Sequence, residues 1–170
     1  MSPKPWLTAA AASALISATG CAMIQSRAEV GPVDQQFMLT AISVGIAEIE
    51  LGQLAMQQSS DPAIRRYGQK MLEEHTRVNS ELDSIAHAKK VVLLKAMDPA
   101  SRTLHAELSK LSGPAFDRQY MISQVNMHSM GNGLYASEAQ HGVDPEVRSF
   151  AARNTPVGVD HLRMAQSMLR

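Results

Sequence analysis

The chain has 170 residues, 45% hydrophobic and 19% charged, with 16 basic and 16 acidic side chains and therefore no formal net charge. This length is sufficient for one domain with a substantial core, and the composition is that of a globular protein. The sequence has no basic patch or run, which argues against nucleic acid as a partner. Aromatic residues are only 4% of the chain, whereas there are 11 Met residues, and this mixture favours helices over strands.

The first 20 residues have the pattern of a bacterial export signal. A short start containing Lys4 precedes an apolar run, residues 7–18, which is too short to span a bilayer permanently. The run ends at Ala-Thr-Gly before Cys21, the only cysteine. Small residues followed by Cys resemble a lipobox, which predicts that residues 1–20 are a lipoprotein signal peptide and that Cys21 is lipidated. The alternative is an ordinary signal peptide cleaved after Gly20 or Ala22.

A lipidated Cys21 would place the protein in the bacterial cell envelope, facing the periplasm and anchored in a membrane. We expect the outer membrane, although the sequence does not distinguish it from the inner one. With Cys21 acylated, no thiol remains for a disulfide or a thiolate metal site. Residues 21–33 include Gly31 and have little periodicity, so they are predicted to be a flexible tether with a reach of roughly 20 Å. Protein partners are not indicated.

Two long helices are predicted after the tether, separated by a turn at residues 59–62. The first covers residues 34–58 and the second residues 62–89, where an Asp-Pro pair provides a cap and a favourable first helical position. In both, apolar residues recur at alternating spacings of three and four, which indicates one buried face. A single ionisable residue interrupts each apolar stripe, Glu48 in the first and His75 in the second.

The second half predicts a short helix, residues 99–111, and two long ones, residues 114–141 and 145–169. Each follows an Asp-Pro or Gly-Pro pair. The stripes of the two long helices are again interrupted by an ionisable residue, His128 and His161.

Several residues inside these two helices are unusual. Gly131 and Gly133 each cost about 1 kcal/mol relative to Ala, unless they allow a neighbouring helix to approach closely. Pro156 is expected to kink or split the last helix. Glu138 and His141 have the spacing of a di-iron ligand pair, but they lie in the last turn of their helix and are predicted to be a surface pair.

The predicted fold is all-α. Residues 34–170 are expected to form a ferritin-like up-down four-helix bundle with one short crossover helix, since this buries four apolar stripes. Counted from the turns at about 1.5 Å per residue, Glu48 and His75 differ in height by about 3 Å. His128 lies midway along its helix, and His161 is within about 4.5 Å of that level. The sequence therefore predicts one polar layer across the middle of the bundle.

Three imidazoles and a carboxylate are a ligand set suited to zinc, copper or iron. One transition-metal ion is therefore a candidate cofactor, with Glu48, His75, His128 and His161 as its ligands. The alternative is a metal-free layer, in which a buried Glu shares protons and hydrogen bonds with His side chains and fixes the helix register. Single His residues on apolar stripes are more often satisfied core residues than ligands.

Four further polar residues are predicted to support the layer with hydrogen bonds to its members. They are Tyr120, Gln124, Asn132 and Tyr135. No catalytic residue is predicted.

Two groups of segments resemble a bacterial family of unknown function, whose members are often described as predicted outer membrane proteins and grouped with ferritin-like bundles. The first group is Ile-Ala-Glu at 46–48, Leu-Gly-Gln-Leu-Ala at 51–55, Met71 and Glu-His at 74–75. The second is Gly-Pro-Ala-Phe-Asp-Arg-Gln-Tyr at 113–120, His128, Thr-Pro at 155–156 and His-Leu at 161–162. The likeness covers residues 35–169 and implies a fold and an export signal, but no activity.

One departure from ferritin-like proteins limits the predicted chemistry. Their di-iron sites use Glu-x-x-His on two helices, but here Leu72, Val125 and Gly158 stand three residues before the histidines. Three functions are thus considered. The first is an envelope-anchored, non-enzymatic bundle that holds one metal ion. The second is a structural or stress-related envelope protein with a metal-free layer. The third, less favoured, is a metal-dependent oxidoreductase.

Overall fold

The computed structural model describes residues 30–169, which form five helices and, within this range, no strand. They are α1 (Pro32–Gln58), α2 (Pro62–Ala88), α3 (Pro99–Leu108), α4 (Gly113–His141) and α5 (Pro145–Met168). The predicted all-α bundle of four long helices and a short crossover helix is therefore confirmed. The predicted signal peptide and Cys21 lie outside the described residues.

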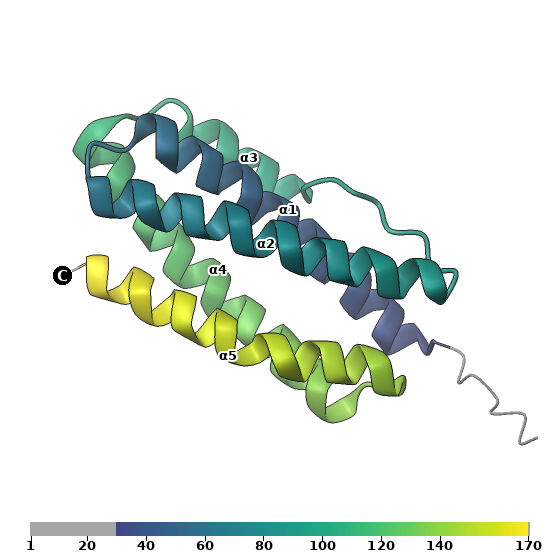
Figure 1. Ribbon diagram of the computed structural model, residues 1–170. Helices are drawn as coiled ribbons and strands as arrows, with labels where there is room; N and C mark the ends of the chain where they lie inside the picture. Colours follow the sequence, from purple (N-terminus) through teal and green to yellow (C-terminus); the bar gives the residue numbers. More distant parts are fainter. Residues whose placement is uncertain (1–29, 170) are drawn as a thin grey trace, which may run out of the picture.

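The bundle consists of two helical hairpins (Figure 1). α1 and α2 run antiparallel and pack along their length, as do α4 and α5. An extended segment and α3 return the chain to the end where α2 began, so α4 runs in the same direction as α2. Contacts between the hairpins are fewer than contacts within them, and α1–α4 is the larger of the two contacts that join them.

Asp-Pro pairs begin three of the five helices, as the sequence predicts. The side chains of Asp61, Asp98 and Asp144 each accept hydrogen bonds from backbone N–H groups in the first turn that follows. α1 begins at Pro32, two residues before its predicted start, with Gly31 as the N-cap.

Asp34, the predicted first residue of this helix, lies inside the first turn of α1 and connects two parts of the bundle. Its carboxylate accepts hydrogen bonds from the backbone N–H of Gly31 and from those of Val143 and Asp144 in the α4–α5 loop. These hydrogen bonds hold the start of α1 against the second hairpin. The helix therefore begins at Pro32, within the segment predicted to be a tether.

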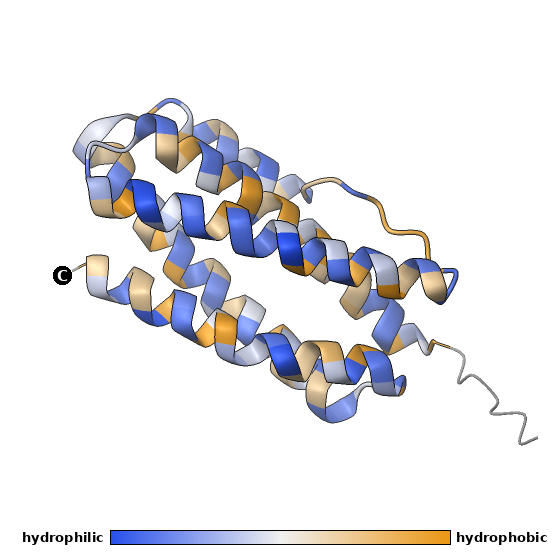
Figure 2. Cartoon of the chain, in the orientation of Figure 1, coloured by the Kyte–Doolittle hydropathy of each residue, from blue (hydrophilic) through white to orange (hydrophobic). Residues whose placement is uncertain are grey.

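Hydrophobic and hydrophilic residues alternate along the long helices (Figure 2). The apolar core that they form is divided into two clusters, one towards the start of α1 and the other towards its end. The first contains Phe37, Met38, Ala41, Ile42, Val78, Leu82, Ile85, Ala86, Val147, Phe150 and Ala151. The second contains Leu51, Leu54, Ala55, Ile64, Tyr67, Met71, Leu108, Phe116, Tyr120, Met121 and Ala165. Along α1, α2 and α5 the predicted polar layer falls between the residues of these two clusters. Along α4 it falls between the second cluster and Leu134 and Tyr135, which are partly buried and pack against the first.

Glycines allow close helix contacts, but not at the two positions in α4 that the sequence suggested. A Cβ on Gly52 would lie 2.5 Å from the backbone oxygen of Gly68, and one on Gly68 would lie 2.7 Å from that of Gly52. α1 and α2 therefore cross here at a distance that only glycine permits. A Cβ on Gly131 or Gly133 would meet no heavy atom within 4 Å, so close approach does not explain these two.

Pro156 does not split α5, which is continuous from Pro145 to Met168. The turn before it is supported by side chains: Asn154 donates to the carbonyl of Phe150, and Thr155 donates to that of Ala151. α1 is long and apolar enough to cross a membrane, with a hydropathy of 1.4 in its best window, and 56% of that window is buried inside the bundle.

Candidate metal centre

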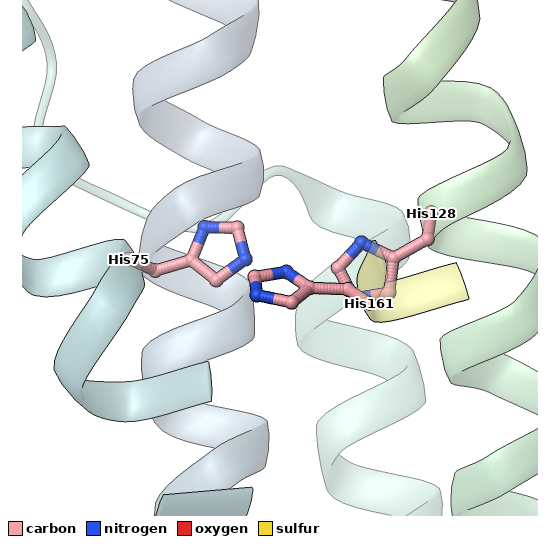
Figure 3. Close-up of side chains that lie close together, drawn as sticks. All are labelled: His75, His128 and His161. Atoms are coloured by element: carbon pink, nitrogen blue, oxygen red, sulfur yellow. The ribbon is translucent and has the colours of Figure 1, made fainter. Parts of the chain in front are cut away.

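His75, His128 and His161 converge from three helices (Figure 3). One nitrogen of each ring lies within 4.8 Å of the corresponding nitrogens of the other two. The ring centroids are 5.0 Å apart for His128–His161, 5.6 Å for His75–His161 and 5.9 Å for His75–His128. We call these three residues the histidine triad. α2 provides one ring and the α4–α5 hairpin provides two, so the triad lies between the hairpins.

Glu48 of α1 completes the layer. Its Oε1 atom lies 3.9 Å from Nε2 of His128, which is too long for a hydrogen bond. The carboxyl group is fully buried. All four helices of the bundle thus contribute one predicted ligand to the same level.

The layer is rich in polar atoms that lack a hydrogen-bonding partner among the described residues. Both carboxyl oxygens of Glu48, Nε2 of His75, Nε2 of His128 and Nδ1 of His161 are buried without one. An unsatisfied buried polar group costs about 1–3 kcal/mol. Five such atoms at one level are unusual in a folded core, and all five are able to bind a metal.

Burial determines the protonation of this layer. It raises the pKa of Glu48 to about 7, an effect that the amide of Gln124 partly offsets. It lowers the pKa of His128 to about 3 and that of His75 well below its usual value, in both cases with a contribution from neighbouring imidazoles. Burial also lowers the pKa of His161, despite the opposing effect of Glu74. The triad is therefore neutral at pH 7, which is the state that binds metals.

Glu74 is a partner of the triad that the sequence did not reveal. Its Oε2 lies 2.6 Å from Nε2 of His161, and Lys70 hydrogen-bonds its other oxygen. Although burial acts to raise the pKa of Glu74, these two hydrogen bonds bring it below the ordinary value. The apolar stripe of α2 includes His75 but not Glu74, so the periodicity gave no signal for this partner.

The four residues predicted to support the layer have different surroundings. Asn132 and Tyr135 line a cavity of about 50 Å³ together with Glu48 and the triad. The amide oxygen of Gln124 accepts a hydrogen bond from the Tyr67 hydroxyl. Tyr120 does not line the cavity. Its ring stacks on Phe116, and its hydroxyl is buried without a partner among the described residues.

A glycine of α5 allows one of these side chains to reach the cavity. A Cβ on Gly158 would lie 2.3 Å from Oδ1 of Asn132. Gly158 stands where a di-iron protein would carry a carboxylate, three residues before His161. The position is occupied instead by an amide from α4, so the departure in sequence corresponds to a different arrangement around the triad.

The geometry of the triad is close to that of a metal site. Metal–nitrogen bonds of about 2.0–2.1 Å in a tetrahedral site place two ligand nitrogens about 3.4 Å apart. The nitrogens of the triad are within 4.8 Å of one another, so shifts of roughly 1 Å would bring them into a common coordination sphere. Glu48 or a solvent molecule could provide the fourth ligand.

The prediction that Glu138 and His141 are a surface pair is wrong for Glu138. His141 is exposed, but Glu138 is only 2% exposed, and both of its carboxyl oxygens are buried without a partner in the described chain. Burial and the nearby carboxylates of Asp34 and Asp144 raise the pKa of Glu138 to about 7. Because the loop after α4 folds back over its last turn, a position near the helix end is enclosed.

Comparison with known proteins shows the family of this chain. Residues 19–168 match a domain of unknown function, DUF4142. The chain belongs to the DUF4142 family. The comparison of this DUF4142 chain with curated proteins found no match.

Two solved structures share the DUF4142 fold. A DUF305 fragment from Deinococcus radiodurans has a TM-score of 0.74 and 14% identity over 82% of this chain and 97% of its own. A conserved hypothetical protein from Mycobacterium tuberculosis has a TM-score of 0.62 and 16% identity over 81% of this chain and 90% of its own. At these identities the likeness concerns the fold alone, so an argument about function depends on the layer itself.

Proposed function

We propose that the protein binds one transition-metal ion through His75, His128 and His161, with Glu48 as a candidate fourth ligand. The observation that carries this proposal is that one nitrogen from each of three rings, on three helices, lies within 4.8 Å of the other two. Each ring also has a buried nitrogen without a partner in the described chain, as do both carboxyl oxygens of Glu48. The neutral state of the triad favours binding, because no imidazole proton must first be removed.

The ligand types restrict the metal. Imidazoles suit zinc, copper, iron and nickel, whereas calcium and magnesium prefer oxygen ligands. Among the described residues, Glu48 is the single carboxylate that lines the cavity, which distinguishes the site from a carboxylate-bridged di-iron centre. We therefore favour one zinc, copper or iron ion in a non-enzymatic binding site over an oxidoreductase.

The position of the layer suggests what the metal would do for the fold. His75 belongs to the first hairpin, and His128 and His161 belong to the second. A metal held by all three would connect two halves that pack more tightly within themselves than against each other. Metal binding would therefore stabilise the folded bundle.

The second candidate is a metal-free polar layer that fixes the register of the helices. The observation in its favour is that two polar groups beside the triad already have protein partners. His161 is hydrogen-bonded to Glu74, and Tyr67 is hydrogen-bonded to Gln124. This candidate leaves Glu48 and the facing nitrogens of His75 and His128 unexplained.

We further propose that the protein is an envelope lipoprotein anchored through Cys21, in the outer membrane. Support comes from the residues that precede Cys21 in the sequence. Mass spectrometry of the protein from bacterial membranes would show a diacylglyceryl-modified Cys21 as the first residue. A soluble protein beginning at an unmodified Cys21 or at Met23 would contradict the anchor and leave the metal proposal untouched.

Metal analysis tests the main proposal. The domain, residues 30–170, is purified without chelator and titrated with zinc, copper and ferrous iron under anaerobic conditions. We expect the parent to bind one ion per chain. A His128→Ala, His161→Ala double variant should bind none over the same range of metal concentrations. A His87→Ala, His141→Ala variant, which changes two exposed histidines, is the matched control. Absence of stoichiometric metal in the parent would contradict the proposal.

A further inference from the structure

The cavity at the triad adjoins a larger groove on the surface. The groove has a volume of about 550 Å³ and lies between α1, the start of α3 and α4. Three residues, Val44, Met127 and Gly131, line both the groove and the cavity. These three therefore form the boundary between the outside of the bundle and the layer that contains the triad.

Gly131 leaves free space at this boundary. A Cβ at this position would meet no heavy atom of the described residues within 4 Å, although the residue lies in the middle of a long helix. Gly133 has equally free space around it, but it is exposed and lines neither the groove nor the cavity. Only one of the two glycines that weaken α4 is thus placed where a side chain would fill a passage.

The lining of the groove determines what can use it. Most of the lining is apolar, with Leu104, Met130 and Leu134 beside the boundary residues, and Met130 is 78% exposed. Among the described residues, Asp98 is the one charged residue that lines the groove, and its carboxylate accepts hydrogen bonds from the first turn of α3. A charged solute would lose hydration in such a groove without compensation, whereas an uncharged one would not.

A second hollow, of about 320 Å³, approaches the cavity between α2 and α5 and has the opposite character. Its lining includes Lys70, Glu74, Arg77 and Asp160, and it shares Val157 with the cavity. The hydrogen bond between Glu74 and His161 lies across this side. Charged side chains and an ordered hydrogen bond make it a poor path for an uncharged molecule.

We propose that the groove between α1, α3 and α4 is the passage by which small uncharged molecules reach the ion at the triad, and that Gly131 keeps this passage open. The inference rests on the proposed metal site for what the molecule meets at the end of the passage. It makes the centre one that accepts an external ligand, as catalytic and ligand-binding metal sites do, and not a closed structural site.

The first test needs no metal. The metal-free protein is treated with diethyl pyrocarbonate, an uncharged reagent that modifies neutral imidazole, and each histidine is followed by peptide mass spectrometry. We expect Gly131→Leu to slow modification of His128 several-fold relative to the exposed His87, and Val44→Ala to accelerate it. Gly133→Leu, which makes the same change in helix propensity, should leave the rate as in the parent.

The second test uses protein loaded with cobalt(II), with imidazole as the added ligand at an alkaline pH where it is uncharged. Its binding changes the visible spectrum of the metal, and Gly131→Leu should slow this change while Gly133→Leu does not. The passage is overturned if Gly131→Leu reacts as fast as the parent in both tests, or if Gly133→Leu slows the reactions equally. If the parent takes up no metal, the proposed function fails, and the diethyl pyrocarbonate rates still decide the passage.

Discussion

The Nε2 atom of His161 lies 2.6 Å from Oε2 of Glu74, and this bond determines which nitrogen of the ring can bind a metal. Because the pKa of Glu74 is low and that of His161 is also lowered, the pair is a neutral ring that donates its Nε2 proton to a carboxylate. Nδ1 is then the free acceptor, and it is the atom that is buried without a partner in the described chain. Carboxylate–histidine pairs of this kind orient metal ligands and increase their basicity.

Removing that carboxylate should weaken metal binding without removing a ligand. For Glu74→Ala we expect a loss of about 10–100-fold in affinity, the usual effect of deleting a partner of this type. Isothermal titration with the preferred metal measures the change. Glu73→Ala, one residue away and exposed, is the control. Equal affinities in the two variants would show that Glu74 has no role in orienting His161.

Metal binding should also stabilise the fold, because the triad joins the two hairpins. At a free metal concentration 100 times the dissociation constant, the free energy of unfolding should increase by about 2.7 kcal/mol. Thermal unfolding with and without metal measures this gain, which His75→Ala should abolish. An increase that persists in His75→Ala would mean that the metal binds elsewhere.

The arrangement of the layer could be predicted because it depends only on helix geometry. The turns fix where each long helix begins, a constant rise fixes the height of each residue, and the apolar stripe fixes the side that faces inward. Glu48, His75, His128 and His161 each interrupt such a stripe, so their common height followed from counting. Side-chain contacts across the bundle do not follow from counting, because they depend on the rotation and spacing of the helices.

Glu74, Glu138 and the glycines illustrate that limit. Glu74 reaches the triad only because α5 packs beside α2, which no periodicity in α2 indicates. Glu138 is enclosed by a loop that folds back over its helix end. The glycines have opposite surroundings: Gly52 lies at a helix crossing and Gly131 at an open boundary. A sequence pattern shows that a residue lacks a side chain, but not what would occupy the space.

Replacing part of the layer by apolar side chains should stabilise the metal-free protein. Glu48 and His128 face each other at 3.9 Å as buried groups without partners in the described chain. Exchange of buried polar pairs for well-packed apolar residues is often stabilising by about 1–4 kcal/mol. We expect a gain of this size in the free energy of unfolding for the double variant Glu48→Leu, His128→Leu, measured in urea with chelator present. The same variant should no longer be stabilised by added metal. A less stable double variant would indicate that the layer is satisfied in solution and fixes the packing.

The crossing of α1 and α2 should not tolerate a Cβ. In Gly52→Ala the new atom would lie 2.5 Å from the backbone oxygen of Gly68, so the helices must separate. We expect a net loss of about 1–3 kcal/mol, as for other overpacked cores, despite the better helix propensity of Ala. Gly133→Ala has free space and should instead be stabilising by up to about 1 kcal/mol. Urea unfolding of both variants measures the two changes in the free energy of unfolding. If the two changes had the same sign, the close crossing of α1 and α2 would be contradicted.

Glu138 should make the stability of the bundle depend on pH. Six charged or titratable groups of the described chain meet at this end. They are Glu138 on α4, Asp34 on α1, Lys89 after α2, Asp144 in the α4–α5 loop, and Glu146 and Arg148 on α5. Burial raises the pKa of Glu138 from 4.5 to about 7. Between these values the folded protein binds more protons than the unfolded chain, so the contribution of Glu138 to stability falls as pH rises.

The variant Glu138→Gln removes this titration and keeps the size of the side chain. Near pH 4.5 the variant and the parent should have similar free energies of unfolding. As the pH rises to about 7, the free energy of unfolding of the variant should increase relative to that of the parent. Above this pH it should exceed the parent's by a constant amount of at most about 3 kcal/mol. The difference changes only between pH 4.5 and about 7, because outside this range Glu138 has the same protonation in the folded and unfolded parent. Urea unfolding of both proteins across the range measures the difference, with the exposed Glu73→Gln as control. A difference that does not change with pH would show that the pKa of Glu138 is not raised on folding, because Lys89 or Arg148 offsets the effect of burial.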